Sequence, residues 1–232
     1  MISSNIQLIA FDADDTLWDC QGHFELVMQQ LYDELSPWVD RETATAELFA
    51  TERKNMPMLG FGVKAFTLSM LETAMRVSHQ QMPATTLNDI LQRCYTLLSF
   101  PTTPLPGVTD TLQRLRTDGR WRMVVFTKGE LQDQENKLRR SGLMPLFDDV
   151  EITSDKTQHE FRQLCEHQQV HPSQLLMVGN SLKSDIAPAL AIGAWAVHIP
   201  FHVTWELEHT DTFEHPRLMA ITHFSDLLPL LL

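Results

Sequence analysis

Apolar residues follow two patterns along this chain. Short continuous apolar runs bounded by polar residues or glycine are typical of buried parallel strands. We expect such strands at residues 6–11, 121–127, 174–178 and 194–199, and a further candidate strand at residues 149–153. Between residues 18 and 100 such runs are missing, and apolar residues such as Phe24, Val27 and Leu31 recur at helical spacing instead. The pattern predicts an α/β core interrupted by a helical insertion.

The order of these elements also predicts how the core is built. Strands that alternate with helices form a parallel sheet with right-handed crossovers and helices on both faces. We therefore expect residues 1–17 and 101–232 to form a doubly wound, Rossmann-like α/β core, and residues 18–100 to form an inserted helical domain. The proline-rich stretch 100–107 is a natural return linker, because proline ends helices and stiffens the chain.

The first apolar run ends in two carboxylates, Asp12 and Asp14. They fall at the C-terminal end of a strand, where open α/β sheets bind ligands. Side chains alternate between the two faces of an extended chain, so residues 12 and 14 begin on the same face. Neighbouring carboxylates repel unless a cation, a shared proton or bulk water intervenes, and a hard, oxygen-seeking cation such as Mg²⁺ fits best. The alternative is that the acids cap the next helix or shape a turn.

Polar groups also follow the second and third expected strands. Thr127 ends the second, and Lys128, Gly129 and a polar helical stretch come next. A hydroxyl, backbone amides and a helix N-terminus can together cradle a phosphate. Lys156 follows the third strand and can neutralise an anion. These residues predict a binding site for a phosphorylated ligand.

The fourth strand leads into Asn180 and Asp185, whose amide oxygen and carboxylate are possible metal ligands. An acid pair, a hydroxyl, a lysine and oxygen ligands, each at a strand end and in this order, resemble the four motifs of the haloacid dehalogenase (HAD) superfamily of phosphohydrolases. Further resemblance lies in residues 105–108, and in residues 137–143 with residues 147–148. The insertion between the first two motifs resembles the C1 type of cap.

The resemblance implies a role for each motif. Asp12 would be the nucleophile that becomes an aspartyl phosphate, and Asp14 the general acid/base that protonates the leaving alkoxide and then accepts a proton from water. The phosphoryl oxygens would be held by Thr127, the Lys128 amide and Lys156. Mg²⁺ would bind Asp12, the Asp14 backbone carbonyl, Asn180 and Asp185.

Two positions depart from the usual motifs. Asn180 stands where the family most often has an acid, so we expect weaker metal binding, with the cation relying on Asp12 and Asp185 for charge balance. Thr157 stands after Lys156 where many relatives have proline. We expect the second change to affect only the entry into the following helix.

Substrate choice in relatives depends on the cap. Among its cations, we expect Arg53, Lys54 or Lys64 to reach the leaving group of a small phosphorylated substrate. The alternative is that they are solvated surface cations, as long charged side chains usually are. Trp18 either lines the entrance or packs in the core.

Three other functions stay open beside a phosphatase. A haloacid dehalogenase would not keep an acid at Asp14, and a phosphonatase would use a cap lysine, with Lys54 as the candidate, as a Schiff-base nucleophile. A noncatalytic protein could keep the fold and bind a phosphorylated ligand, with Asn180 as the only support.

Composition narrows the class of protein. The chain has 232 residues, 43% of them hydrophobic, which suffices for a sizeable core. Its three widely spaced cysteines argue against a disulfide framework or zinc site and favour the reducing cytoplasm. A net charge of −12 without a basic stripe disfavours nucleic acid, and no targeting or membrane segment is visible. Five histidines near the C-terminus lack compact metal-ligand spacing. The sequence leaves the oligomeric state open.

Overall fold

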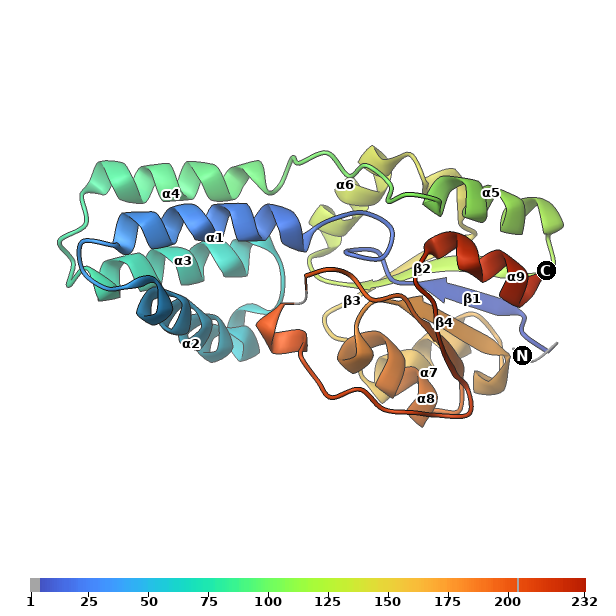
Figure 1. Cartoon of the computed structure of the whole chain (residues 1–232). Coiled ribbons are helices and arrows are strands. Elements are labelled where there is room, and N and C mark those ends of the chain that lie inside the picture. Colours follow the sequence, from blue (N-terminus) through green and yellow to red (C-terminus); the bar gives the residue numbers. More distant parts are fainter. Residues whose placement is uncertain (1–4, 204) are drawn as a thin grey trace. The chain divides into compact units, whose positions relative to one another are not determined.

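The computed structural model describes residues 5–203 and 205–232 (Figure 1). The chain forms two compact units, one made of the residues up to Cys20 together with Thr102–Leu232, and the other of Gln21–Pro101. The first boundary lies three residues later than the sequence predicted, because Trp18 belongs to the α/β unit. Its indole is fully buried, and its backbone carbonyl accepts a hydrogen bond from the Asp15 amide at 2.8 Å.

The α/β unit contains a six-stranded sheet in the order β3-β2-β1-β4-β5-β6, with every neighbouring pair parallel. The strands are β1 (Leu8–Phe11), β2 (Arg122–Lys128), β3 (Asp149–Thr153), β4 (Leu175–Gly179), β5 (Trp195–His198) and β6 (Leu218–Ala220). The predicted α/β fold class is confirmed. Strand β6 was not predicted, since three residues are too few for a recognisable period.

Strand β1 occupies the switch point of this sheet. It pairs with β2 on one side and β4 on the other, so that Ala10 lies between Val124 and Met177. Crossovers that leave a central strand in opposite directions put their helices on opposite faces and open a crevice at the carboxyl ends of the strands. Residues that follow β1 are therefore placed where this fold binds ligands.

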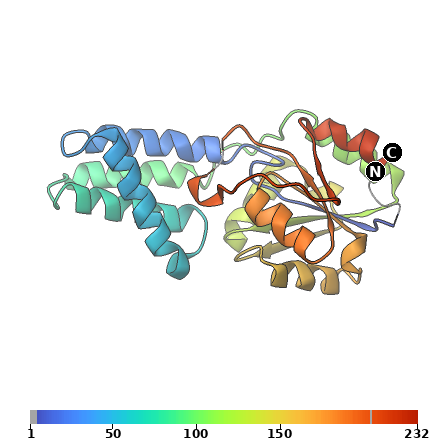
Figure 2. The same cartoon turned by 60° about the horizontal axis from the view of Figure 1, so that its bottom comes forward.

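Helices cover both faces of the sheet. Helices α5 and α9 lie on one face and α7 and α8 on the other, as Figures 1 and 2 show. Side chains of β1 alternate between the two faces of the sheet. Leu8 and Ala10 pack against Phe161 of α7, whereas the Phe11 ring contacts Phe224 just before α9. The helices are α5 (Val108–Asp118), α6 (Leu131–Ser141), α7 (Gln158–His167), α8 (Ala187–Ala191) and α9 (Leu227–Leu231).

The second unit is entirely helical in its secondary structure, with α1 (Gln21–Leu35), α2 (Arg41–Leu59), α3 (Val63–Val77) and α4 (Ala84–Thr96). It has a hydrophobic core of its own, to which all four helices contribute, among others through Leu31, Leu48, Met70 and Ile90. Gly60 ends α2 with a φ of 71°, a conformation that a side chain would strain. No helix in residues 5–203 and 205–232 is long and apolar enough to cross a membrane.

Thr157 determines how α7 begins. Its hydroxyl accepts a hydrogen bond from the His159 amide at 3.1 Å, and Glu160 reaches back to the Thr157 amide at 3.0 Å, which completes a capping box. Threonine thus supplies a cap that a proline at the same position cannot.

Loss of this cap gives a first testable expectation. Thr157→Ala should lower the free energy of unfolding by about 1 kcal/mol, because it leaves helix amides without a partner. Thr157→Ser keeps a hydroxyl and should lose much less. Urea denaturation of both variants measures the difference, and equal losses would show that the cap does not stabilise the helix.

Candidate active site

Asp12 follows the last residue of β1 and lies buried at the carboxyl edge of the sheet. Its amide donates to the Val178 carbonyl at 2.9 Å, so the backbone is fixed by the neighbouring strand β4. Its Oδ2 accepts from the Thr16 hydroxyl at 3.0 Å, and its Oδ1 accepts from the Lys156 ammonium. The sheet therefore presents one carboxylate with both oxygens already oriented.

Lys156 joins two carboxylates that are far apart in sequence. Its Nζ donates to Asp12 and, at 2.6 Å, to Asp185 Oδ1, and the side chain is almost completely buried. Burial acts to lower the pKa of Lys156, but the two carboxylates outweigh it and raise that pKa, so the amine stays charged. Burial and the nearby Asp185 raise the pKa of Asp12 to about 7, although Lys156 opposes the shift.

Asp14 lies at the same strand end with a different set of partners. Its Oδ1 accepts from the Trp18 indole at 2.8 Å, and its Oδ2 accepts from Gln134 at 2.9 Å and Lys137 at 2.7 Å. Burial acts to raise the pKa of Asp14, but the Lys137 ammonium and these hydrogen bonds lower it overall. The two acids of the first motif therefore have different environments.

The second motif forms a turn between β2 and α6. Thr127 is buried at the end of β2, and Gly129 follows with a φ of 140°, where the Cβ of any other residue would lie 2.9 Å from Gln134 Nε2. The Lys128 ammonium donates to Ser184 Oγ at 2.7 Å and is paired with Glu208. These two contacts fix the Lys128 side chain at the edge of the site, and its backbone forms part of the turn.

The fourth motif depends on a close approach at Gly179. A Cβ at this position would lie 2.3 Å from Asp185 Oδ2, so only glycine lets the π-helical turn η3 (Leu182–Ile186) bring Asp185 back over the strand. The Ser181 amide then donates to Asp185 Oδ2 at 3.0 Å. Asn180 Oδ1 lies 3.1 Å from Thr16 Oγ1, which is also the donor to Asp12. The structure thus links the first, third and fourth motifs through direct hydrogen bonds.

The three cations expected to contact substrate lie in the helical unit. Arg53 and Lys54 belong to α2 and Lys64 to the first turn of α3, and all three are exposed. Lys54 pairs with Glu72 of α3 at 2.7 Å. A role for these residues in substrate binding stays a prediction.

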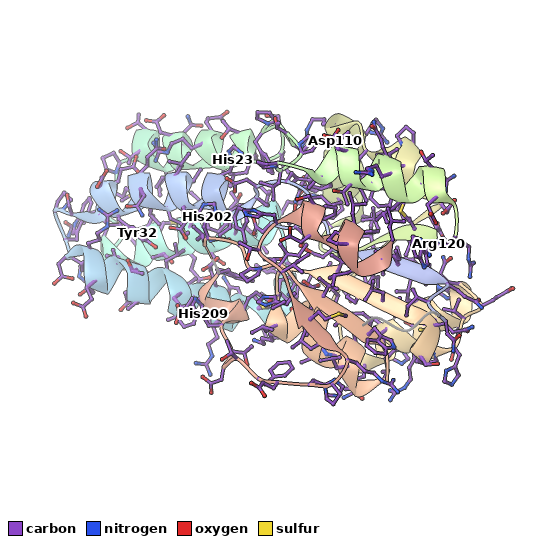
Figure 3. The ribbon with its side chains drawn as sticks, turned by 45° about the vertical axis from the view of Figure 1, so that its right-hand side comes forward. His23, Tyr32, Asp110, Arg120, His202 and His209 are labelled. Atoms are coloured by element: carbon purple, nitrogen blue, oxygen red, sulfur yellow. The ribbon has the colours of Figure 1, made fainter. Side chains whose placement is uncertain are left out.

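Sequence reasoning missed four side chains that contact the motif residues: Thr16, Gln134, Lys137 and Glu208. Lys137 belongs to a stretch that resembles the family, but its distance of more than a hundred residues from Asp14 concealed the contact. Glu208 lies in the short helix η4 (Glu206–Glu208), on the segment that follows β5 and carries His202 and His209 (Figure 3). It accepts from Ser181 and Ser184 at 2.6 Å each.

Comparison with known proteins agrees with this geometry. The family described as haloacid dehalogenase-like hydrolase matches residues 6–193, and the chain belongs to it. It is therefore a hydrolase of the HAD superfamily.

Three relatives illustrate the similarity. Glyceraldehyde 3-phosphate phosphatase of Methanothermobacter thermautotrophicus is 26% identical over 211 residues, which are 86% of this chain and 88% of that protein. A haloacid dehalogenase-like hydrolase from Xanthomonas campestris is 30% identical, with a TM-score of 0.86 and coverage of 98% and 92%. A predicted phosphoglycolate phosphatase from Haemophilus somnus 129PT shares the fold, with a TM-score of 0.65, 18% identity and 98% coverage of each chain.

Proposed function

We propose that this protein is a Mg²⁺-dependent phosphomonoester hydrolase that acts on a small phosphorylated metabolite through an aspartyl-phosphate intermediate. The observation that carries the proposal is the buried Asp12–Lys156–Asp185 cluster at the carboxyl end of β1, beside an acid with its own separate partners. Such a cluster would supply a carboxylate nucleophile next to an ammonium that can bind the transferring phosphoryl group.

Each residue has a defined task in this reaction. Asp12 attacks phosphorus, and Asp14 protonates the ester oxygen as it leaves. The equatorial phosphoryl oxygens are held by the Thr127 hydroxyl, the Lys128 amide and the Lys156 ammonium. Asp14 then accepts a proton from the water that hydrolyses the aspartyl phosphate, which releases phosphate and restores Asp12.

The side chains at this edge fit Mg²⁺. Thr16 Oγ1 lies within hydrogen-bond distance of both Asp12 Oδ2 and Asn180 Oδ1, but it carries only one hydrogen and can serve one of them at a time. The other oxygen has acceptor capacity for a cation. Asp12, the Asp14 backbone carbonyl, Asn180 and Asp185 would hold the metal, which would neutralise charge on the phosphoryl oxygens.

No set of three or more His, Cys, Asp or Glu side chains in the described part of the chain is arranged to hold a metal ion. The proposed site therefore needs the Asn180 amide oxygen and a backbone carbonyl in addition to its two carboxylates. Because an amide brings no charge, we expect Mg²⁺ to bind more weakly than at a site with a third acid.

The proposed substrate class is supported by the relative from Methanothermobacter thermautotrophicus, which is named for its activity on glyceraldehyde 3-phosphate. We infer a small phosphorylated metabolite here and test triose phosphates first. The free and buried Cys20, Cys94 and Cys165 suit the reducing cytoplasm, which is where we place the reaction.

The alternatives have less support. A dehalogenase has no use for an acid anchored as Asp14 is by three donors. A Schiff-base lysine needs a desolvated amine, whereas Lys54 is 71% exposed and paired with Glu72. A noncatalytic phosphate-binding role would use the Lys156 ammonium but gives no role to the Asp12 carboxylate, whose charge repels a phosphate.

The deciding experiment is an assay of phosphate release from p-nitrophenyl phosphate and a panel of triose, sugar, glycolate and nucleoside phosphates. With Mg²⁺ we expect turnover, and with EDTA we expect it to fall by at least about 100-fold, because several kcal/mol of charge stabilisation are lost. Turnover that persists in EDTA would contradict the metal requirement. Tight ligand binding without turnover would support the noncatalytic alternative.

Metal binding should also depend on pH in a defined direction. The pKa of Asp12 in the folded protein is about 7, above its ordinary value of 3.8. Protonated Asp12 therefore stabilises the folded state at low pH, and this contribution is lost as pH rises through 7. Mg²⁺ competes with the proton at Asp12. We therefore expect Mg²⁺ to raise the Tm more at about pH 8 than at about pH 5.5. Thermal melts of wild type and Asp12→Asn measure this, and an equal increase at both pH values in wild type would contradict it.

A further inference from the structure

Lys137 is a buried cation to which the proposed reaction assigns no role. Its side chain is 3% exposed, and its ammonium lies 2.7 Å from Asp14 Oδ2 and 3.5 Å from Asp133. Removing an ammonium from water costs several kcal/mol, and the carboxylates of Asp14 and Asp133 offset that cost and keep Lys137 charged. The structure thus holds a buried positive charge directly beside the proposed acid/base.

Gln134 supplies a second and independent observation. Its Nε2 donates both to Asp14 Oδ2 and to the Lys128 carbonyl, each at 2.9 Å. Its Oε1 is buried and, within the described residues, has no hydrogen-bond partner. An unsatisfied buried oxygen costs about 1–3 kcal/mol, so this amide is held with its donor group toward Asp14 at the expense of its own acceptor.

Helix geometry explains why these groups act together. Gln134 and Lys137 are three residues apart on α6, a spacing that places them on one face of the helix. The Trp18 indole approaches the same carboxylate from the loop after β1 and donates to Oδ1 at 2.8 Å. Three donors from two segments therefore fix the Asp14 carboxylate in one orientation.

The contacts distinguish the two oxygens of Asp14. Each carboxylate oxygen has two lone pairs, and the hydrogen bonds from Gln134 and Lys137 use both of those on Oδ2. Oδ1 accepts from Trp18 and keeps acceptor capacity. The proton that Asp14 transfers can therefore reside on Oδ1.

We propose that Lys137, Gln134 and Trp18 are positioning residues that orient Asp14 so that its Oδ1 exchanges the proton with the leaving group and then with water. The inference rests on the proposed phosphatase function. In the first half-reaction the ester P–O bond breaks as Asp12 attacks phosphorus, and the Oδ1 proton moves to the departing oxygen, which leaves as an alcohol. In the second, Oδ1 takes a proton from the attacking water while the bond between phosphorus and Asp12 breaks.

The dependence of the rate on the leaving group tests this role. Esters of strongly basic alcohols need the proton, whereas p-nitrophenolate and 2,4-dinitrophenolate leave with little help. The second half-reaction is common to all esters, so a loss there lowers kcat on every ester alike, whereas kcat/KM reports the first half-reaction. For Lys137→Met we expect kcat/KM to fall by about 100-fold on alkyl and phenyl phosphates and by less than about fivefold on 2,4-dinitrophenyl phosphate. The plot of log kcat/KM against the leaving-group pKa should become steeper, as it should for Asp14→Asn.

Further variants distinguish a positioning role of Lys137 from a purely structural one. Arg140→Met removes an exposed charge from the same helix and should leave the plot unchanged. Trp18→Phe and Gln134→Met remove one donor each without removing a buried charge, and they provide the test if Lys137→Met does not fold. An equal loss of kcat/KM on all esters in the folded variants would overturn the inference and leave the phosphatase proposal intact. A wild-type protein that hydrolyses no ester would overturn the phosphatase proposal itself.

Discussion

Asp12→Asn is expected to lower the turnover of every phosphate ester by at least about 10⁴-fold, because an amide cannot form the aspartyl phosphate. The variant should remain folded. Asparagine has nearly the same shape, and Lys156 keeps its hydrogen bond to Asp185 at 2.6 Å. Steady-state phosphate release measures the loss, and circular dichroism checks the fold.

The intermediate gives a second measurement of the same prediction. Acid-quenched wild type incubated with substrate should carry a phosphate adduct in its intact mass, and Asp12→Asn should carry none. Asp110→Asn is the matched control, since Asp110 is an exposed aspartate of α5 in the same unit (Figure 3). An adduct that persists in Asp12→Asn would assign the nucleophile to another residue.

Lys156→Met is expected to damage both stability and activity. The variant leaves Asp12 and Asp185 buried without their shared cation, and an uncompensated buried charge costs about 3–5 kcal/mol. The loss should be larger at high pH. Removing the ammonium raises the pKa of Asp12 further above about 7, so the folded variant keeps its proton at low pH and loses stability as pH rises.

Urea denaturation at about pH 5.5 and about pH 8 measures this effect. Arg162→Met, an exposed change on α7, should shift stability by less than about 0.5 kcal/mol. Adding Asp185→Asn to Lys156→Met should restore part of the lost stability, because it removes one of the two unpaired carboxylates. A destabilisation that is independent of pH would show that Lys156 stabilises by packing alone. Phosphate release should fall in every variant that lacks the ammonium.

The Asp12 and Lys156 variants test different roles, the covalent step in one case and the stability of the site in the other. Asp12 is expected to matter mainly for the covalent step, whereas Lys156 holds the acids together and is expected also to bind the phosphoryl group. Variants of the two residues should therefore differ in stability far more than they differ in residual activity.

Local sequence was sufficient for most of the fold and for the motif residues. The sequence predicted five of the six strands. Continuous apolar runs mark β1, β2 and β4, because a strand buried on both faces needs such sequence, whereas the partly exposed edge strand β3 alternates polar and apolar residues. Asp12, Asp14, Thr127, Lys156 and Asp185 were recognised because each lies at or soon after the carboxyl end of a strand, and the parallel arrangement brings such strand ends to one edge.

Tertiary structure decided how these residues are paired. Sequence could not show that Lys156 bridges Asp12 and Asp185, or that Lys137 and Gln134 of α6 hold Asp14, because such contacts depend on helix placement and not on local periodicity. The same limit applies to Glu208, which lies in a short turn without any repeating pattern. The chain alone determined which chemical groups are present and at which sheet edge they fall. Packing of distant segments determined their charges, orientations and partners.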